Sequence, residues 1–114
     1  MPKTAPSKIF SLEEARRTLP LVRERTRRAL EEMQALGGDG DGEPGSREDV
    51  LPVEAARILS AWATEMEDLG LAVKGPWLVD FDSGGGYYCW TWPEESLDYF
   101  HGYEEGFAGR MRLQ

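Results

Sequence analysis

The chain has 114 residues, which is enough for one hydrophobic core and too few for two. Hydrophobic residues make up 40% of it and charged residues 30%, as in soluble globular proteins, and no apolar run approaches the roughly 20 residues of a membrane span. We therefore expect a single domain over residues 1–114, without a membrane partner. The single Cys excludes an internal disulfide and fits a reducing compartment, so we expect a cytoplasmic location.

The net charge of -8 is unevenly distributed along the chain. Residues 1–36 carry eight Lys and Arg against five Asp and Glu, whereas residues 37–114 carry five against sixteen. An acidic majority repels phosphate backbones and disfavours a nucleic-acid partner. Attraction between the two parts of the chain, or between two copies, explains the asymmetry equally well.

Residues 11–36 are predicted to form the first helix, after a flexible N-terminus at residues 1–9. Ser11-Leu12-Glu13-Glu14 has the pattern of a capping box. The apolar phase continues through Pro20, so we expect a kinked but continuous helix. Residues at alternating steps of three and four form one seam, namely Leu12, Ala15, Leu19, Val22, Thr26, Ala29, Met33 and Leu36.

Residues 37–49 are predicted to be a flexible, acidic, glycine-rich loop, and residues 50–70 a second helix. Glycines cost ordering entropy and carboxylates need water, and the spacing does not match a calcium-binding EF-hand. Pro52 suits the first turn of the helix and Gly70 its end. One face carries Val53, Ala56, Leu59 or Ser60, Ala63, Met66 and Leu69.

Two such helices joined by a flexible loop are expected to fold back as an antiparallel pair. The first helix is longer than the second, so part of its apolar seam lacks a partner within the pair. This surplus predicts self-association through the first helix, most simply as a homodimer.

Residues 76–114 change to the period of two that is typical of strands. Aromatic and β-branched runs on either side of 82–86 predict a β-hairpin. The expected cross-strand pairs are Phe81 with Tyr87, Val79 with Cys89, and Asp80 with Tyr88. Gly102, Gly106 and Gly109 predict a compact, irregular tail with one short helical turn. The fold class is therefore α+β, a long antiparallel helical hairpin packed with a C-terminal aromatic β-hairpin and a glycine-rich tail.

The segment 77–112 holds the residues that could build a chemical site. It carries ten of the twelve aromatic residues, the only Cys, the only His and seven carboxylates. The candidate ligand-binding residues are Asp80, Cys89, Trp90, Glu94, His101 and Arg110. We expect His101 and Arg110 to pair with Asp80 or Glu94, because burying an unpaired charge is costly.

A divalent metal is a candidate cofactor. His101, Glu104 and Glu105 stand at spacings of three and four and would share one face of a helical turn. Asp80, Glu94 or Cys89 would complete such a site, although a closed zinc site normally uses several Cys and His. A structural hydrogen bond from His101 to Asp80 or Glu94 is the simpler interpretation.

Other chemistries find less support. Cys89 lies within a predicted strand, and only His101 could activate it as a nucleophile. Paired acids such as Glu94 with Asp98 or Glu104 arise readily from this composition. Stacked aromatic residues would need a basic groove to bind bases, and the charge here is negative. Because no catalytic motif is present, the sequence does not predict an enzyme.

Short motifs along nearly the whole chain carry a family resemblance. They are Phe10-Ser11-Leu12-Glu13-Glu14-Ala15 with Leu19-Pro20, Trp77-Leu78-Val79-Asp80-Phe81, Cys89-Trp90 with Glu94, Tyr99-Phe100-His101, and Glu105-Gly106-Phe107-Ala108-Gly109-Arg110. The pattern resembles that of an uncharacterised bacterial family, domain of unknown function 2203. The chain departs from it at Asp82, where that family usually has Pro, and at Phe100, where it usually has Trp. The resemblance implies no reaction.

Two functional hypotheses follow. The first is a homodimeric interaction or ligand-binding module with a polar site around the hairpin and tail. The alternative is a small metal-binding protein or metal-dependent enzyme that uses His101 and nearby carboxylates. Convergence of these side chains in one concave pocket would favour a site.

Overall fold

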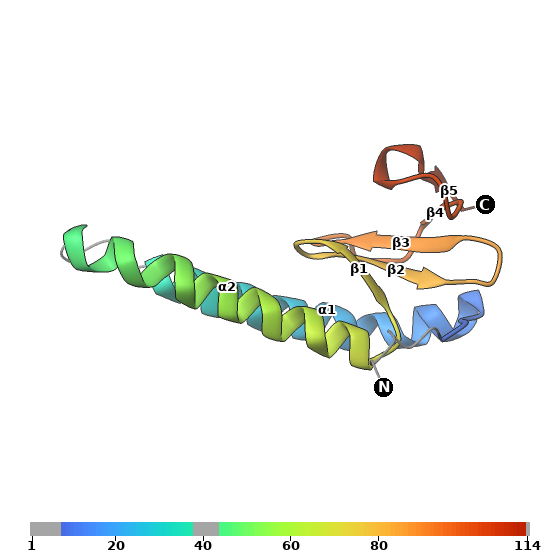
Figure 1. The fold of residues 1–114 in the computed structure, drawn as a ribbon. Coiled ribbons are helices and arrows are strands. Elements are labelled where there is room, and N and C mark those ends of the chain that lie inside the picture. The colour runs from blue at the N-terminus through green and yellow to red at the C-terminus, as the bar shows by residue number, and fades with distance from the viewer. Residues whose placement is uncertain (1–7, 38–43, 114) are drawn as a thin grey trace, which may run out of the picture.

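The computed structural model describes residues 8–37 and 44–113, and the side chains of all of these except 37 and 44–51. Two helices, α1 (Leu12–Gly37) and α2 (Pro44–Asp68), precede five strands: β1 (Ala72–Gly75), β2 (Leu78–Asp82), β3 (Tyr87–Thr91), β4 (Tyr99–His101) and β5 (Met111–Arg112). A short 3-10 helix, η1 (Phe107–Gly109), lies between β4 and β5. The strands form one antiparallel sheet in chain order (Figure 1). The predicted α+β class is confirmed, and neither described helix is long and apolar enough to cross a membrane.

The start of α1 is fixed by the predicted capping box. The backbone N–H of Glu14 donates to Ser11 Oγ at 3.0 Å, and the N–H of Ser11 donates to Glu14 Oε1 at 3.1 Å. These bonds satisfy backbone donors that a helix start leaves free. The helix then runs through Pro20 to Gly37, as the uninterrupted apolar phase predicted.

The start of α2 was wrongly predicted. The helix begins at Pro44 rather than residue 50 and ends at Asp68, with Pro52 in its interior. Pro44 is itself suited to the first helical position, and the glycine-rich composition masked that signal. Of the predicted loop 37–49, residues 38–43 lie outside the described residues, and 44–49 are helical.

The helices pack along the predicted seam of α1, but the predicted face of α2 was partly wrong: Val53 and Ala56 are exposed, and Trp62 and Met66 are buried. In Figure 1 they form a long hairpin whose far end extends beyond the sheet. Within the seam, the indole Nε1 of Trp62 donates a hydrogen bond to the Thr26 hydroxyl at 2.8 Å, with both side chains buried. A polar pair thus stands among buried side chains, where an unpaired indole N–H would be costly.

The N-terminal part of the α1 seam packs against the sheet. Ala15, Leu19 and Val22 belong to the same buried cluster as Val79 and Trp90 of the sheet. The two helices are also nearly equal, with 26 and 25 residues. From Leu12 to Ala29 the seam therefore packs within the chain, and the difference in helix length that motivated self-association is absent; the homodimer itself stays a prediction.

Basic residues of α1 also form ion pairs with acidic residues elsewhere in the same chain. Arg16 of α1 donates to the carbonyl oxygen of Leu97 at 3.1 Å and lies 3.9 Å from the Asp98 carboxylate. Arg25 lies 3.6 Å from the Glu65 carboxylate of α2. The basic first helix thus contacts the acidic remainder of its own chain.

The predicted hairpin is present, but its register was wrong by one residue. The observed pairs are Leu78–Thr91, Val79–Trp90, Asp80–Cys89, Phe81–Tyr88 and Asp82–Tyr87. The turn is shorter than predicted because Asp82 pairs with Tyr87 and also caps the turn, with its Oδ1 accepting from the N–H of Gly84 at 2.9 Å. Directly paired residues share a face, so Asp80 and Cys89 become neighbours.

Strand alternation gives the sheet an apolar face and a polar face. Val79, Phe81 and Trp90 point toward the helices and are fully buried. Asp80 and Cys89 point to the opposite side, over which the tail with η1 lies (Figure 1). The site-forming residues are therefore held between the sheet and the tail.

Strands β1, β4 and β5 were not predicted as strands. They have four, three and two residues, too few for a period of two to be recognised. They extend the hairpin to five strands, and β4 brings His101 beside β3.

We predict that Thr26→Val lowers the free energy of unfolding by about 1–3 kcal/mol, because it preserves the shape and leaves the Trp62 N–H buried without an acceptor. Urea denaturation followed by circular dichroism measures the loss. Thr18→Val is the matched control, since Thr18 bonds only to the Glu14 carbonyl of its own helix. A Thr26→Val protein as stable as the control would contradict the role of this bond.

Candidate functional site

Three neighbouring strands bring Asp80, Cys89 and His101 together. Asp80 and Cys89 are direct partners in the β2–β3 ladder, and His101 stands opposite Tyr87 in the β3–β4 ladder, two residues along from Cys89. The side chains are almost inaccessible, with whole-residue exposures of 1%, 1% and 2%. One oxygen, one sulfur and one nitrogen of the three lie within 4.8 Å of one another.

The orientation of the His101 ring is set by two hydrogen bonds. Its Nδ1 lies 2.8 Å from the Gly102 carbonyl oxygen, which can only accept, so Nδ1 carries a proton. Its Nε2 lies 3.0 Å from Asp80 Oδ2. The Tyr87 ring flanks the imidazole with centroids 5.5 Å apart. Nε2 is therefore the nitrogen that faces Asp80 and the interior of the cluster.

The Asp80 carboxylate is only partly satisfied. Its Oδ2 faces His101 and lies 3.8 Å from Lys74 Nζ, whereas its buried Oδ1 accepts no hydrogen bond of regular distance and angle from any residue that the structure describes. The Cys89 thiol beside the carboxylate is only a weak donor to it. Burial raises the pKa of Asp80, and His101, a hydrogen bond from the Cys89 thiol and Lys74 oppose this by favouring the charged form. A buried carboxylate oxygen without a donor is costly.

The Cys89 thiol is held in its protonated form. Burial and the negative charge of Asp80 raise its pKa to about 12. The guanidinium of Arg110 partly opposes this, with its Nη1 3.9 Å from Sγ. Because both nitrogens of His101 are directed to other groups, the geometry gives no support to a Cys–His nucleophile.

Arg110 and Glu94 form the predicted bridge. Arg110 donates from Nη1 to Glu94 Oε1 at 3.2 Å and from Nη2 to Oε2 at 2.6 Å, a bidentate pair. The guanidinium lies 4.0 Å from the Tyr99 ring centroid and 4.1 Å from that of Phe107. Glu94 Oε1 also accepts from the Thr91 backbone. This pair holds the tail on the sheet, and the His101–Asp80 pair is likewise as predicted.

Trp90 lies on the other face of the sheet from the cluster. It is fully buried in the apolar core, and its Nε1 donates to the Glu94 carbonyl oxygen at 2.8 Å. Its inclusion among the site residues followed from the wrong register. In the structure Trp90 supports the fold rather than the site.

The helical turn expected for His101, Glu104 and Glu105 is absent from this described segment. His101 ends β4, and residues 102–105 form a turn rather than a helix. Glu104 is exposed, and Glu105 accepts a hydrogen bond from the Gly102 N–H at 2.9 Å. The three side chains therefore share no helical face, and His101 groups with Asp80 and Cys89 instead.

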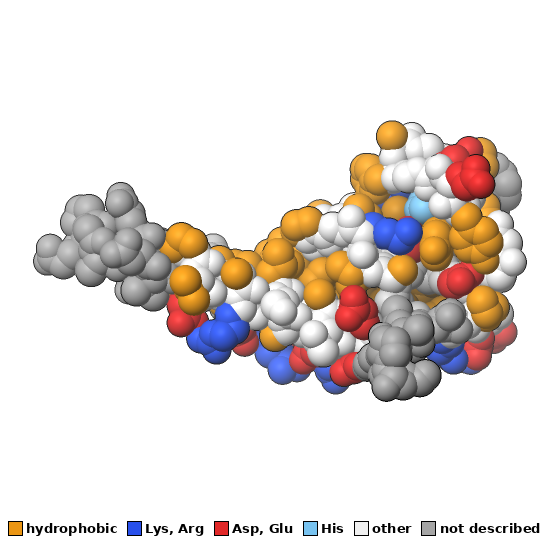
Figure 2. Space-filling model, viewed as in Figure 1, with side chains coloured by type: hydrophobic (Ala, Val, Ile, Leu, Met, Phe, Trp, Pro, Cys, Tyr) orange, Lys and Arg blue, Asp and Glu red, His pale blue; other side chains and the backbone are white. Residues whose placement is uncertain are grey.

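The cluster lies at a pocket of about 290 Å³ between the sheet and the tail. The lining residues are Lys74, Leu78, Asp80, Cys89, His101, Glu105, Gly106 and Phe107. In the space-filling view a small area of the histidine, pale blue, is visible beside a basic side chain (Figure 2). Pockets for small molecules are concave, mainly apolar and contain a few convergent polar groups, as here.

Three residues that line the pocket were not predicted from the sequence: Lys74, Leu78 and Phe107. Lys74 lies on β1, which is too short for its period to be recognised. Leu78 precedes Asp80 by two residues, so strand alternation alone could have placed it on the site face, whatever the register. Phe107 is brought in by the tail, and its sequence carries no signal for this position.

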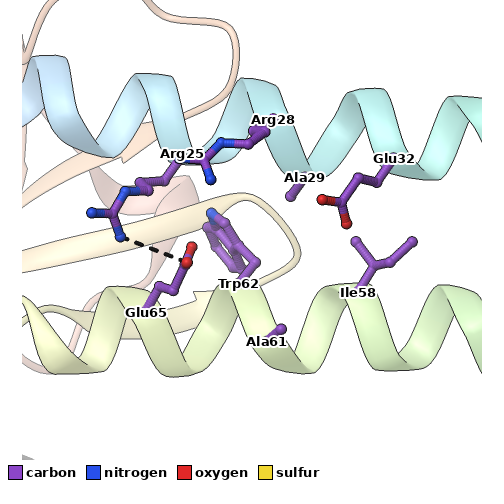
Figure 3. Close-up of a pocket in the computed structure, with 8 residues that line it drawn as sticks. All are labelled: Arg25, Arg28, Ala29, Glu32, Ile58, Ala61, Trp62 and Glu65. Atoms are coloured by element: carbon purple, nitrogen blue, oxygen red, sulfur yellow. Dashed lines mark ion pairs between the residues drawn. The ribbon is translucent and has the colours of Figure 1, made fainter.

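A second hollow lies between the helices (Figure 3). It has a volume of about 70 Å³, and the Arg25–Glu65 ion pair and Trp62 stand beside it. Its remaining lining residues are Arg28, Ala29, Glu32, Ile58 and Ala61. The space suits a few waters rather than a ligand, and it brings no nucleophile or metal-ligand set together.

The chain belongs to a family of uncharacterised conserved proteins, DUF2203, whose family model matches residues 8–113. This confirms the family indicated by the sequence motifs. No curated protein and no solved structure matches the chain. The family description assigns no function, so any function must be argued from the site.

We predict that the Cys89 thiol of the metal-free native protein reacts very slowly with a disulfide reagent at pH 8, because burial and a pKa of about 12 keep it protonated and shielded. Absorbance of the released chromophore measures one thiol per chain only after unfolding in urea. Rapid labelling of the native protein would show that the thiol is accessible and ionised.

We predict that Arg110→Lys lowers the free energy of unfolding by about 1–3 kcal/mol, because Lys cannot form the bidentate pair or stack between two rings. Thermal or urea denaturation measures the change. Arg112→Lys is the control, since Arg112 is exposed and lies 5.9 Å from the Tyr99 ring. Equal stability of the two variants would refute the structural role of the bridge.

Proposed function

We propose that this DUF2203 protein binds one divalent transition-metal ion, with Zn²⁺ as the best match, through Asp80, Cys89 and His101. The observation that carries the proposal is the convergence of one ligand atom from each of the buried Asp80, Cys89 and His101 within 4.8 Å, at a carboxylate whose Oδ1 accepts no regular hydrogen bond from the described residues. A cation bound to the carboxylate would satisfy it.

The donor set fits this chemistry. Zinc takes thiolate, imidazole and carboxylate ligands, and metal bonds of about 2.0–2.3 Å separate the ligand atoms of a tetrahedral site by roughly 3.3–3.8 Å. The three atoms here lie within 4.8 Å of one another, so small side-chain shifts suffice. Thiolate and imidazole also favour zinc over the hard cations Mg²⁺ and Ca²⁺.

The second shell of His101 supports the same assignment. Metal-bound histidines commonly donate their other ring N–H to a carbonyl or carboxylate, which fixes the ring and the tautomer. The Nδ1–H bond to Gly102 does this and leaves Nε2 directed toward Asp80. In the metal-free protein a proton between Nε2 and Oδ2 takes the place of the cation.

Burial gives a metal ion a thermodynamic role. Without a cation, the charged forms of Asp80 and Cys89 are disfavoured in this enclosed site. A divalent ion compensates two negative ligands, and its binding is coupled to proton release and to folding. We infer that the metal stabilises the packing of β2, β3 and β4.

Three protein ligands leave one coordination position for a small molecule. Structural zinc sites are normally closed by four protein ligands, whereas three ligands and an open position are typical of catalytic sites. The pocket of about 290 Å³ adjoins the cluster, so the open position would face it. The same geometry therefore admits metal-dependent chemistry on a small substrate, the alternative derived from the sequence.

We predict that protein purified without an affinity tag binds one Zn²⁺ or Co²⁺ per chain. Elemental analysis and a Co²⁺ titration measure the stoichiometry, and a thiolate-to-cobalt charge-transfer band reports Cys89 as a ligand. Cys89→Ser, Asp80→Asn and His101→Ala should each weaken binding by more than about 100-fold, since even second-shell changes cost 10–100-fold. Bound metal should also raise the unfolding temperature of the native protein.

Glu104→Gln is the matched control, because it removes an exposed carboxylate three residues from His101 and should leave metal binding unchanged. No metal uptake by the native protein would overturn the proposal. So would a Cys89→Ser protein that binds Co²⁺ as tightly as the native chain. Loss of binding in the Glu104 variant would favour the set His101, Glu104 and Glu105 instead.

A further inference from the structure

The pocket beside Asp80, Cys89 and His101 has one basic residue among its lining residues, Lys74. Its Nζ lies 3.8 Å from Asp80 Oδ2 and 4.3 Å from the Tyr87 ring centroid. These contacts hold the ammonium group at the wall of the pocket, while 39% of the side chain stays exposed. Lys74 is thus both positioned and accessible.

A metal ion would change the charge balance around Lys74. In the metal-free protein the Asp80 carboxylate is its nearest partner. Once that carboxylate binds a cation, its charge is shared with the metal and Lys74 is left with a weaker counter-charge. The metal and the ammonium group would then form two neighbouring positive centres at one pocket, a pair suited to one carboxylate group.

The other charged groups near the pocket limit the charge of the ligand. Arg110 is engaged by Glu94 in a bidentate pair and is absent from the pocket lining. Glu105 does line the pocket, and its carboxylate would repel a second negative charge. A ligand with one negative charge therefore fits better than inorganic phosphate.

The residues that line the pocket limit the size and polarity of the rest of the ligand. Leu78 and Phe107 contribute apolar surface, and Gly106 contributes no side chain. The volume of about 290 Å³ lies at the small end of the range for ligand pockets. An unbranched apolar chain of a few carbons would be buried against these residues.

We propose that the pocket binds a small monocarboxylate with a short apolar chain, its carboxylate between the metal and Lys74 and its chain against Leu78 and Phe107. This inference rests on the proposed metal site. It assigns Lys74 as the specificity-determining residue and a carboxylic acid as the class of ligand.

Co²⁺-loaded protein tests the ligand class directly. Its visible spectrum changes when a ligand enters the coordination sphere, so acetate, propionate and butyrate can be titrated in turn. We expect butyrate to bind, butyramide to leave the spectrum unchanged, and affinity to rise about fourfold for each added CH₂ group, as expected for its burial. Inorganic phosphate should bind more weakly than butyrate.

Lys74→Met should weaken butyrate binding about tenfold, the usual effect of losing a hydrogen bond to a charged group. Lys74→Arg keeps the charge and should retain most of the affinity. Lys8→Met is the matched control, since Lys8 lies over Phe10 and does not line the pocket. The Co²⁺ spectrum before butyrate addition reports whether each variant keeps the metal site.

The outcomes separate this inference from the metal site itself. If Co²⁺ binds but butyrate does not, or if butyramide or phosphate binds as tightly as butyrate, the ligand class is wrong and the metal site stands. Equal butyrate affinity in the Lys74→Met and Lys8→Met proteins would remove the role of Lys74. If Co²⁺ does not bind at all, both the proposed function and this inference are overturned.

Discussion

The register of the β2–β3 ladder is the constraint on which the rest of the site depends. Pairing Asp80 with Cys89 sets both on one face, whereas a slip of one residue would send Asp80 toward another partner. The turn enforces this register. Gly84 has a left-handed backbone with φ of 90°, and a Cβ on Gly86 would lie 2.4 Å from the Phe100 ring. Gly84 permits the turn between β2 and β3, and Gly86 leaves room for Phe100 and the His101 backbone of β4 beside β3.

One face of the sheet packs into the apolar core, and the other carries the polar cluster. On one face Val79, Phe81 and Trp90 are buried against the helices, so hydrophobic burial fixes the position of the strands. On the other face the polar groups are few, closely placed and held by the tail through Arg110 and Glu94. An enclosed polar cluster needs a rigid support of this kind, because its side chains keep their relative positions only when the strands that carry them are fixed.

The sequence predicted the helices and the location of the site, but it did not predict the detailed geometry of the site. The capping box at Ser11 and the α1 seam through Val22 and Thr26 depend on local chemistry and a 3.6-residue period, which can be read directly, whereas the burial of Trp62 was not predicted. The link of His101 to Asp80 followed from the cost of burying unpaired groups. The role of Lys74 did not follow, because strands of a few residues show no period and a register depends on turn hydrogen bonds that composition does not specify.

Because the strands follow one another in chain order, the sheet residues that form the site lie on one continuous segment, distinct from the two helices that support it. Every ladder joins consecutive strands, and Asp80 and His101 stand only 21 residues apart, so the meander carries the three cluster residues on one short, continuous segment. Contacts of such low sequence separation cost little loop-closure entropy. The same segment would nevertheless expose Trp90 and Phe81 if the helices were removed, inviting aggregation. Grafting the site onto another scaffold therefore requires the meander together with an apolar surface that replaces α1 and α2.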